Sequence, residues 1–193
     1  LHLCSHNLET INNTTSTTSD NAKHNLLLEV CMAAKYEGDS IKNYYPEHHL
    51  TNPGTASQLC TVLARSFADI GDIVRGKDLF LGNTYESAQR KQLEKNLKKI
   101  FGNIYKELKK KKRKNEEELK ARYQDDTENY YKLREDWWTA NRHTVWEAIT
   151  CNAGGGKYFR NTCGGGTSPT DGHCRCDGDQ VPTYFDYVPQ YLR

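Results

Sequence analysis

Residues 107–120, ELKKKKRKNEEELK, decide whether the middle of this chain is one long rod or a folded-back pair of helices. No glycine or proline lies between residues 103 and 153, so local signals permit a single helix about 75 Å long at about 1.5 Å per residue. Apolar stripes flank the run on both sides, and long helices bury such stripes only against a partner. We therefore expect a fold-back between residues 113 and 127, where NEEE (115–118) and DDTE (125–128) are both candidate N-caps.

Three helices are expected from apolar residues that recur at spacings of three and four. They cover residues 57–75, 85 to about 114, and about 127 to 151. The second and third would form a long antiparallel hairpin on either side of the break. Asp69 and Asp72 lie off the apolar face of the first helix, so we interpret them as solvated surface charge rather than as an acid–base or metal pair.

The six consecutive basic residues at 109–114 have two interpretations. Lysines at the end of one helix and glutamates at the start of the next both suit the helix dipole, by a few tenths to about 1 kcal/mol each. Helix stability does not require six like charges in succession, however, and such a run concentrates positive potential at an exposed tip. The alternative interpretation is a site for a polyanion, made of Lys106, Lys109, Lys110, Lys111, Lys112, Arg113 and Lys114.

The composition fits a helical protein with a polar surface and argues against two kinds of partner. The 193 residues are 36% hydrophobic and 27% charged, with a formal net charge of only +2. A nucleic-acid-binding domain would be expected to have a pI above about 9, so the basic run is a local feature and we expect no nucleic acid partner. No apolar stretch approaches about 18 residues, so we expect no membrane insertion by this segment.

The cysteines favour disulfides and an oxidising compartment. Seven are present: Cys4, Cys31, Cys60, Cys151, Cys163, Cys174 and Cys176. Zinc is the alternative, because His173 lies beside two of them, but the chain has no Cys-x2-Cys pair of the kind usual in structural zinc sites. The odd number leaves one cysteine free or paired with something outside this sequence.

The glycine-rich segment 151–166 is similar to a phosphate-binding loop but does not fit one. Tyr158 stands where Ser or Thr would bind magnesium, and the leading glycine position falls on Cys151. The sequence DGD at 177–179 lacks the ligand spacing and closing Glu of a calcium loop. No Ser/His/Asp or Cys/His arrangement is evident. We therefore expect no enzyme, no cofactor and no metal.

The N-terminal quarter has a different character. Residues 12–21 form a low-complexity polar loop with sequons at Asn12 and Asn13. A short helix is expected around residues 26–34, and residues 43–54, with two prolines, are expected to be irregular.

Three segments resemble one family of adhesion domains. They are LARSFADIGDIVRGKDL (63–79), LREDWWTANRHTVWEAITC (133–151) and DYVPQYLR (186–193). In this order they resemble the Duffy-binding-like domain, alpha class, at the N-terminal head of the erythrocyte membrane protein one adhesins of Plasmodium falciparum. The resemblance covers essentially the whole chain. LCSHNLETI (3–11) with LLLEVCMAAKYEG (26–38) is similar to the end of that family's first subdomain.

The resemblance implies an all-α fold, a disulfide-stapled helical bundle with a long antiparallel helical hairpin and Gly/Cys-rich loops. Residues 1–54 would end a first subdomain and residues 55–193 would form the second, with family sequence expected before and after. It also implies a cell-adhesion module without catalytic activity on the extracellular face of the infected erythrocyte. Its partners would be a host receptor, or sulfated or blood-group glycans, in rosetting and cytoadherence, and host antibodies. The alternative is a structural spacer with an antigenically variable surface, whose adhesion is carried by neighbouring domains.

Particular residues take roles from this resemblance. The family motif residues Trp137, Trp138, Arg142 and Trp146 are expected to pack, because the last three share one helix face and an arginine plane can stack on indole.

Three disulfide pairings are expected. Cys60 would pair with Cys151 if their helices are antiparallel. Cys4 with Cys31, and Cys163 with either Cys174 or Cys176, are the other candidate pairs.

Overall fold

The computed structural model describes residue 8 and residues 22–51, 59–79, 83–110, 116–126, 128–178 and 180–193. These parts contain α2 (Ala22–Thr51), α3 (Leu59–Arg75), α4 (Thr84–Lys110), α5 (Glu116–Tyr123) and α6 (Tyr131–Ile149). Two short 3-10 helices follow near the C-terminus, η1 (Phe185–Tyr187) and η2 (Gln190–Leu192). No β-strand occurs in the described ranges, and the all-α prediction is confirmed.

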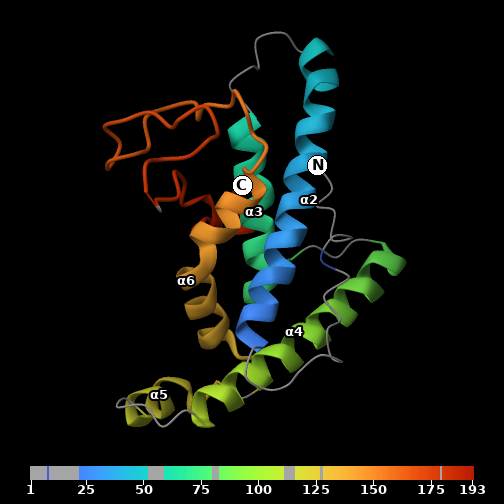
Figure 1. The fold of residues 1–193 in the computed structure, drawn as a ribbon. Helices are drawn as coiled ribbons and strands as arrows, with labels where there is room; N and C mark the ends of the chain where they lie inside the picture. The colour runs from blue at the N-terminus through green and yellow to red at the C-terminus, as the bar shows by residue number, and fades with distance from the viewer. Residues whose placement is uncertain are drawn as a thin grey trace.

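Three helices, α2, α3 and α6, lie side by side around the core, and α4 crosses one end of this group obliquely (Figure 1). The chain reverses between α4 and α6, as predicted, and α5 lies between these two helices in sequence. The predicted long antiparallel hairpin of the two helices is wrong, however, because α4 lies obliquely across the bundle instead of along α6. α6 is buried mainly by α2 and α3, and it touches α4 through the edge-on pair Phe101 and Trp137, whose ring centroids are 6.2 Å apart. The apolar stripe of α6 thus has two further partner helices besides α4.

The core is centred on Phe67 of α3, whose ring centroid lies 5.1 Å from that of Trp138 and 5.2 Å from that of Trp146. Two glycines let the helices approach this closely. A Cβ on Gly71 of α3 would lie 2.7 Å from the Trp138 ring, and one on Gly38 of α2 would lie 2.0 Å from the carbonyl oxygen of Ile149. Any larger residue at either position would push α6 away.

The prediction of an irregular segment after only a short helix is wrong for residues 43–51. α2 is 30 residues long and continues past Pro46 to Thr51. Proline lacks an amide hydrogen and commonly ends or kinks a helix. Here it removes one hydrogen bond near the end of a helix whose earlier turns are supported by packing along α6. Tertiary contacts of this kind commonly override local propensity.

Two disulfides fix the loop region that follows α6, one to helix α3 and one within the loop itself. Cys60 at the start of α3 pairs with Cys174, and Cys163 pairs with Cys176. The second bridge is one of the two predicted alternatives for Cys163. The predicted Cys60–Cys151 pair is wrong, because Cys151 is an exposed free thiol in the turn after α6, whereas the following loop folds back and brings Cys174 to the start of α3.

The predicted Cys4–Cys31 pair is not formed, since Cys31 is a free thiol. Cys4, the sequons at Asn12 and Asn13, and residues 52–58 lie outside the described residues.

Candidate anion-binding surface on helix α4

Helix α4 has a net positive charge, whereas the rest of the chain is net negative. It carries eight Lys or Arg against three Glu, a net of +5, while the whole chain is only +2. Seven of the basic residues fall within an arc of about 120°, at about 100° per residue. We call this set the α4 lysine face: Lys91, Lys95, Lys98, Lys99, Lys106, Lys109 and Lys110.

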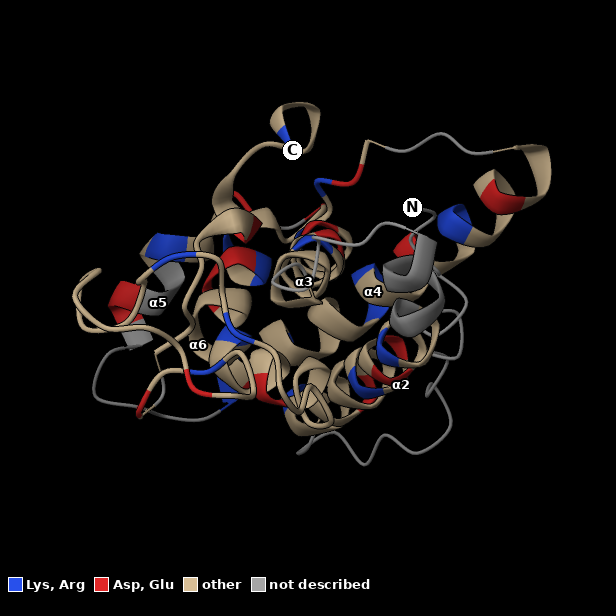
Figure 2. Ribbon diagram, turned by 90° about the horizontal axis from the view of Figure 1, so that it is seen from above, with Lys and Arg blue, Asp and Glu red and all other residues tan. Residues whose placement is uncertain are grey.

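The opposite face of α4 is apolar and buried. Leu93, Leu97, Phe101 and Ile104 are at most 4% exposed. Glu107 also lies on the inner side, where its carboxylate accepts a hydrogen bond from the Ala22 amide at the start of α2. Burial of this stripe fixes the rotation of α4, so the lysines must point outward. Figure 2 shows blue Lys and Arg positions along this helix.

Most of the α4 lysine face has no compensating carboxylate. Glu94 is engaged by the buried Arg134 guanidinium, at 2.7 and 2.9 Å, and only Lys98 approaches it, at 4.0 Å. Lys109 lies over the Tyr105 ring, 4.4 Å from its centroid. The remaining lysines of the face make no ion pair with any described residue, so their positive potential is directed at solvent.

A groove runs beside these lysines. It has a volume of about 920 Å³ and lies between α4, the segment after α3 and the start of α6. Lys95, Lys99 and Lys106 line one wall, and Tyr130 and Tyr131 line part of the other. Tyr130 has a left-handed backbone, with φ of 57°, and its ring packs on Tyr105. The lysines and the neighbouring tyrosine rings thus form a preformed, elongated surface. Its length is about 28 Å, because Lys91 and Lys110 lie at its two ends and an α-helix rises about 1.5 Å per residue.

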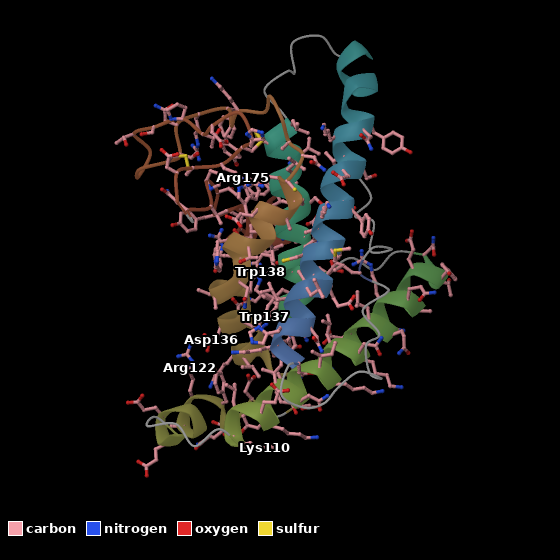
Figure 3. The ribbon with its side chains drawn as sticks, viewed as in Figure 1. Lys110, Arg122, Asp136, Trp137, Trp138 and Arg175 are labelled. Carbon is pink, nitrogen blue, oxygen red and sulfur yellow. A yellow bond between two sulfur atoms is a disulfide. The ribbon has the colours of Figure 1, made fainter. Side chains whose placement is uncertain are left out.

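The predicted basic tip forms only one end of this surface. Lys106, Lys109 and Lys110 are exposed on the last turns of α4, and Figure 3 shows Lys110 beside α5, far from the core. Lys111, Lys112, Arg113 and Lys114 lie outside the described residues. Sequence reasoning missed the lysines at 91, 95, 98 and 99. Their spacing of three and four, half a turn away from the leucine stripe, was the signal that would have found them.

The recognised motif residues form the core and its charge network, not an exposed site. Trp137, Trp138 and Trp146 are at most 7% exposed, as the packing prediction requires. Arg142 stacks on aromatic rings, but these belong to Phe67, Tyr184 and Tyr187 rather than to the indoles.

Asp186 joins two of the motif segments. Its fully buried carboxylate accepts hydrogen bonds from Trp138 Nε1 at 2.9 Å, Arg142 Nε at 2.8 Å and Arg142 Nη2 at 2.7 Å. The C-terminal segment is therefore fastened to α6 through a charged, desolvated contact. In Figure 3 the labelled Trp138 lies along α6, facing the helices it packs on.

The interpretation of Asp72 as solvated surface charge is wrong. Asp72 is 4% exposed and its neighbour Arg75 is 2% exposed. The Asp72 carboxylate pairs with Arg75 at 2.9 Å and also with Arg193. Asp69, half-buried beside it, pairs with Arg193 at 3.3 Å. Residues 185–193 cover this side of α3, which the helix pattern by itself does not reveal.

The described residues contain no group of three or more His, Cys, Asp or Glu placed to hold a metal ion. None of the described helices is long and apolar enough to cross a membrane.

Comparison with known proteins identifies the family. The Duffy binding domain model matches residues 1–193. A PfEMP1 IT4var13 DBLbeta domain described as ICAM-1-binding is similar, with 33% sequence identity and a TM-score of 0.69, over 99% of this chain and 39% of that one. The same kind of domain bound to ICAM-1 gives 31% identity and a TM-score of 0.63, over 99% and 40%. No curated protein sequence matches the chain.

The chain therefore spans about two fifths of the length of these structural relatives. Both relatives are DBLbeta domains, so the alpha class stays a prediction. Because the family model matches from the first residue to the last, the chain belongs to the Duffy binding domain family.

Proposed function

We propose that this chain is part of a cell-adhesion module on the extracellular face of the infected erythrocyte, and that its α4 lysine face binds sulfated glycans of the host cell. The observation that carries the proposal is the set of seven outward lysines on one helix, most of them without a carboxylate partner among the described residues. Family membership supports the adhesion role, since one relative is described as bound to ICAM-1, a host receptor.

The chemistry of the face suits sulfate better than a single small anion. Lysine ammonium groups are compact point charges on flexible stems, so they follow sulfates along a chain without the planar geometry that an arginine–carboxylate pair needs. Successive lysines at 91, 95, 98 and 99 present charges along one helix edge, and 106, 109 and 110 continue them. Contacts of this kind release counterions and weaken as salt rises.

A salt-dependent heparin-binding measurement tests the proposal. Replacing Lys91, Lys95, Lys98 and Lys99 with alanine should lower the salt concentration that elutes the domain from immobilised heparin and flatten the dependence of affinity on salt. The matched control replaces four exposed lysines outside α4, Lys35, Lys42, Lys132 and Lys157, and changes the net charge equally. Equal losses in both variants would show that only overall charge matters.

The same experiment separates the tip from the rest of the face. Replacing Lys109–Lys112 alone tests the tip predicted from sequence. If the tip variant loses retention and the 91–99 variant does not, the site is confined to the end of α4. If the unmodified domain is not retained on heparin above the level of the control, the structural spacer is the better account and adhesion belongs to neighbouring domains.

A further inference from the structure

A second groove lies at the other side of the molecule, between the start of α3 and the disulfide-bonded loops. It has a volume of about 610 Å³. Thr61, Ala64 and Arg65 of α3 form one wall, and residues 158–162, 166, 181–185 and 188 form the other. None of the α4 lysines lines it. The groove is therefore separate from the α4 lysine face, and an inference about it does not depend on the proposed glycan contact.

The loop wall of this groove is rigidly held. Cys163–Cys176 closes the loop and Cys60–Cys174 ties it to α3. The Tyr158 hydroxyl bonds Thr183 at 3.3 Å, and the Tyr158 amide donates to Thr170 at 2.9 Å. A binding surface fixed in this way loses little conformational entropy when a partner binds.

The groove combines an apolar floor with exposed rings at its edge. Val181 and Pro182 are buried in the floor, whereas Phe159 is 56% and Tyr184 is 70% exposed. Exposed aromatic side chains around a depression are typical of protein-recognition sites, where Tyr and Arg supply much of the binding energy.

Two arginines at this groove give it a charge preference. Arg65 and Arg160 are exposed and form no ion pair with a described carboxylate, although Arg65 lies close enough to Asp69 for the two charges to interact. Arg160 instead lies over the Phe159 ring, 5.2 Å from its centroid. The two guanidinium groups match a partner that carries carboxylates.

We propose that this groove binds an acidic peptide segment of a partner protein, with one apolar side chain on the floor and flanking carboxylates on Arg65 and Arg160. The site is additional to the α4 lysine face and takes a protein rather than a glycan. The α4 lysine face and this groove would let one domain bind a polyanion and a protein at separate places. Once one of these partners is bound, the other site would meet its own partner on the same cell surface at a high effective concentration.

The test selects ligands with a phage-displayed library of random 12-residue peptides against the whole domain. Enriched peptides are synthesised and their affinities measured by fluorescence anisotropy. The expected sequences carry Asp or Glu on both sides of an apolar residue. Their affinity should fall about tenfold or more in the double variant Arg65→Glu/Arg160→Glu, because two charge-assisted bonds become repulsions. The variant Phe159→Ser/Tyr184→Ser removes the two exposed rings, of which Tyr184 also stacks on Arg142, and should also weaken binding.

A charge-matched control, Lys42→Glu/Lys132→Glu, should leave the affinities unchanged, and unaltered thermal unfolding of all variants shows that they fold. The proposal is overturned if the enriched peptides lack the acidic and apolar pattern, if they bind the groove variants as well as the control, or if selection enriches nothing. Enrichment of peptides that heparin displaces, but the groove variants do not affect, would assign them to the α4 lysine face and equally reject the groove.

Discussion

Removal of the Asp186 carboxylate is expected to destabilise the domain strongly. This side chain is fully buried and accepts three hydrogen bonds, one from Trp138 and two from Arg142. In Asp186→Ala the Arg142 side chain, only 12% exposed, keeps its charge without its partner. Breaking a buried pair in this way costs about 3–5 kcal/mol. At about 2–4 °C per kcal/mol for a chain of this length, the melting temperature should fall by roughly 6–20 °C.

Urea unfolding of the disulfide-intact domain, followed by tryptophan fluorescence, measures this loss. Asp186→Asn keeps the shape and one acceptor oxygen, so its cost should be smaller than that of alanine. The control Asp125→Ala removes an exposed carboxylate and should change stability by no more than about 0.5 kcal/mol. A loss below about 1 kcal/mol for Asp186→Ala would refute the view that this carboxylate fastens the C-terminal segment to α6.

Three further predictions concern the thiols, pH and the longer disulfide. Burial, and then the Glu147 carboxylate, raise the pKa of the Cys31 thiol to about 11. Iodoacetamide at pH 8 should therefore modify the exposed Cys151 first. Equal labelling of the two cysteines in a peptide mass analysis would contradict this. The Arg122 hydrogen bond lowers the pKa of Asp136, so its stabilisation is present above about pH 4 and lost as pH falls through the lowered value. The stability difference between Asp136→Asn and the unmodified protein should thus shrink in acid, and a difference that grows there would reject the assignment. The Cys60–Cys174 bridge closes a loop of 114 residues, and the loss of chain entropy in the unfolded state makes it worth about 5 kcal/mol of stability. The Cys163–Cys176 bridge closes 13 residues and is worth about 3 kcal/mol. Cys60→Ser should therefore lower the unfolding free energy more than loss of the Cys163–Cys176 bridge.

Much of the helical core was predictable because it depends on local periodicity. The apolar spacing predicted helices at 57–75 and at about 127–151, which the structure has as α3 (Leu59–Arg75) and α6 (Tyr131–Ile149). The reversal between α4 and α6 was predictable because a long apolar stripe needs a partner helix for its burial. The predicted cap of α6 at residues 125–128 is wrong, because α6 begins at Tyr131 and its N-cap is Tyr130, whose side chain makes no capping hydrogen bond. Asp126 still supports the first turn from outside the helix, since its carboxylate accepts a hydrogen bond from the Leu133 amide. Features that repeat every three or four residues are visible in sequence alone.

The failures share a different cause, which is a partner far away in sequence. Asp72 looks solvated until Arg193, 121 residues later, covers it. Cys60 meets Cys174 because of the path of an irregular loop, and no periodicity predicts such a path. The α4 lysine face is a different case, because the spacing of its lysines is a local pattern that the sequence does contain. The run of six basic residues marks only the C-terminal end of that face.

Protection of individual lysines from acetylation tests the central claim most directly. The domain is treated with an acetylating reagent with and without a heparin decasaccharide, and each lysine is quantified by peptide mass spectrometry. The account predicts protection of Lys95, Lys98, Lys99 and Lys106, with Lys35, Lys42, Lys132 and Lys157 as reactive as before. Uniform reactivity along α4, or protection centred on the control lysines, would contradict it.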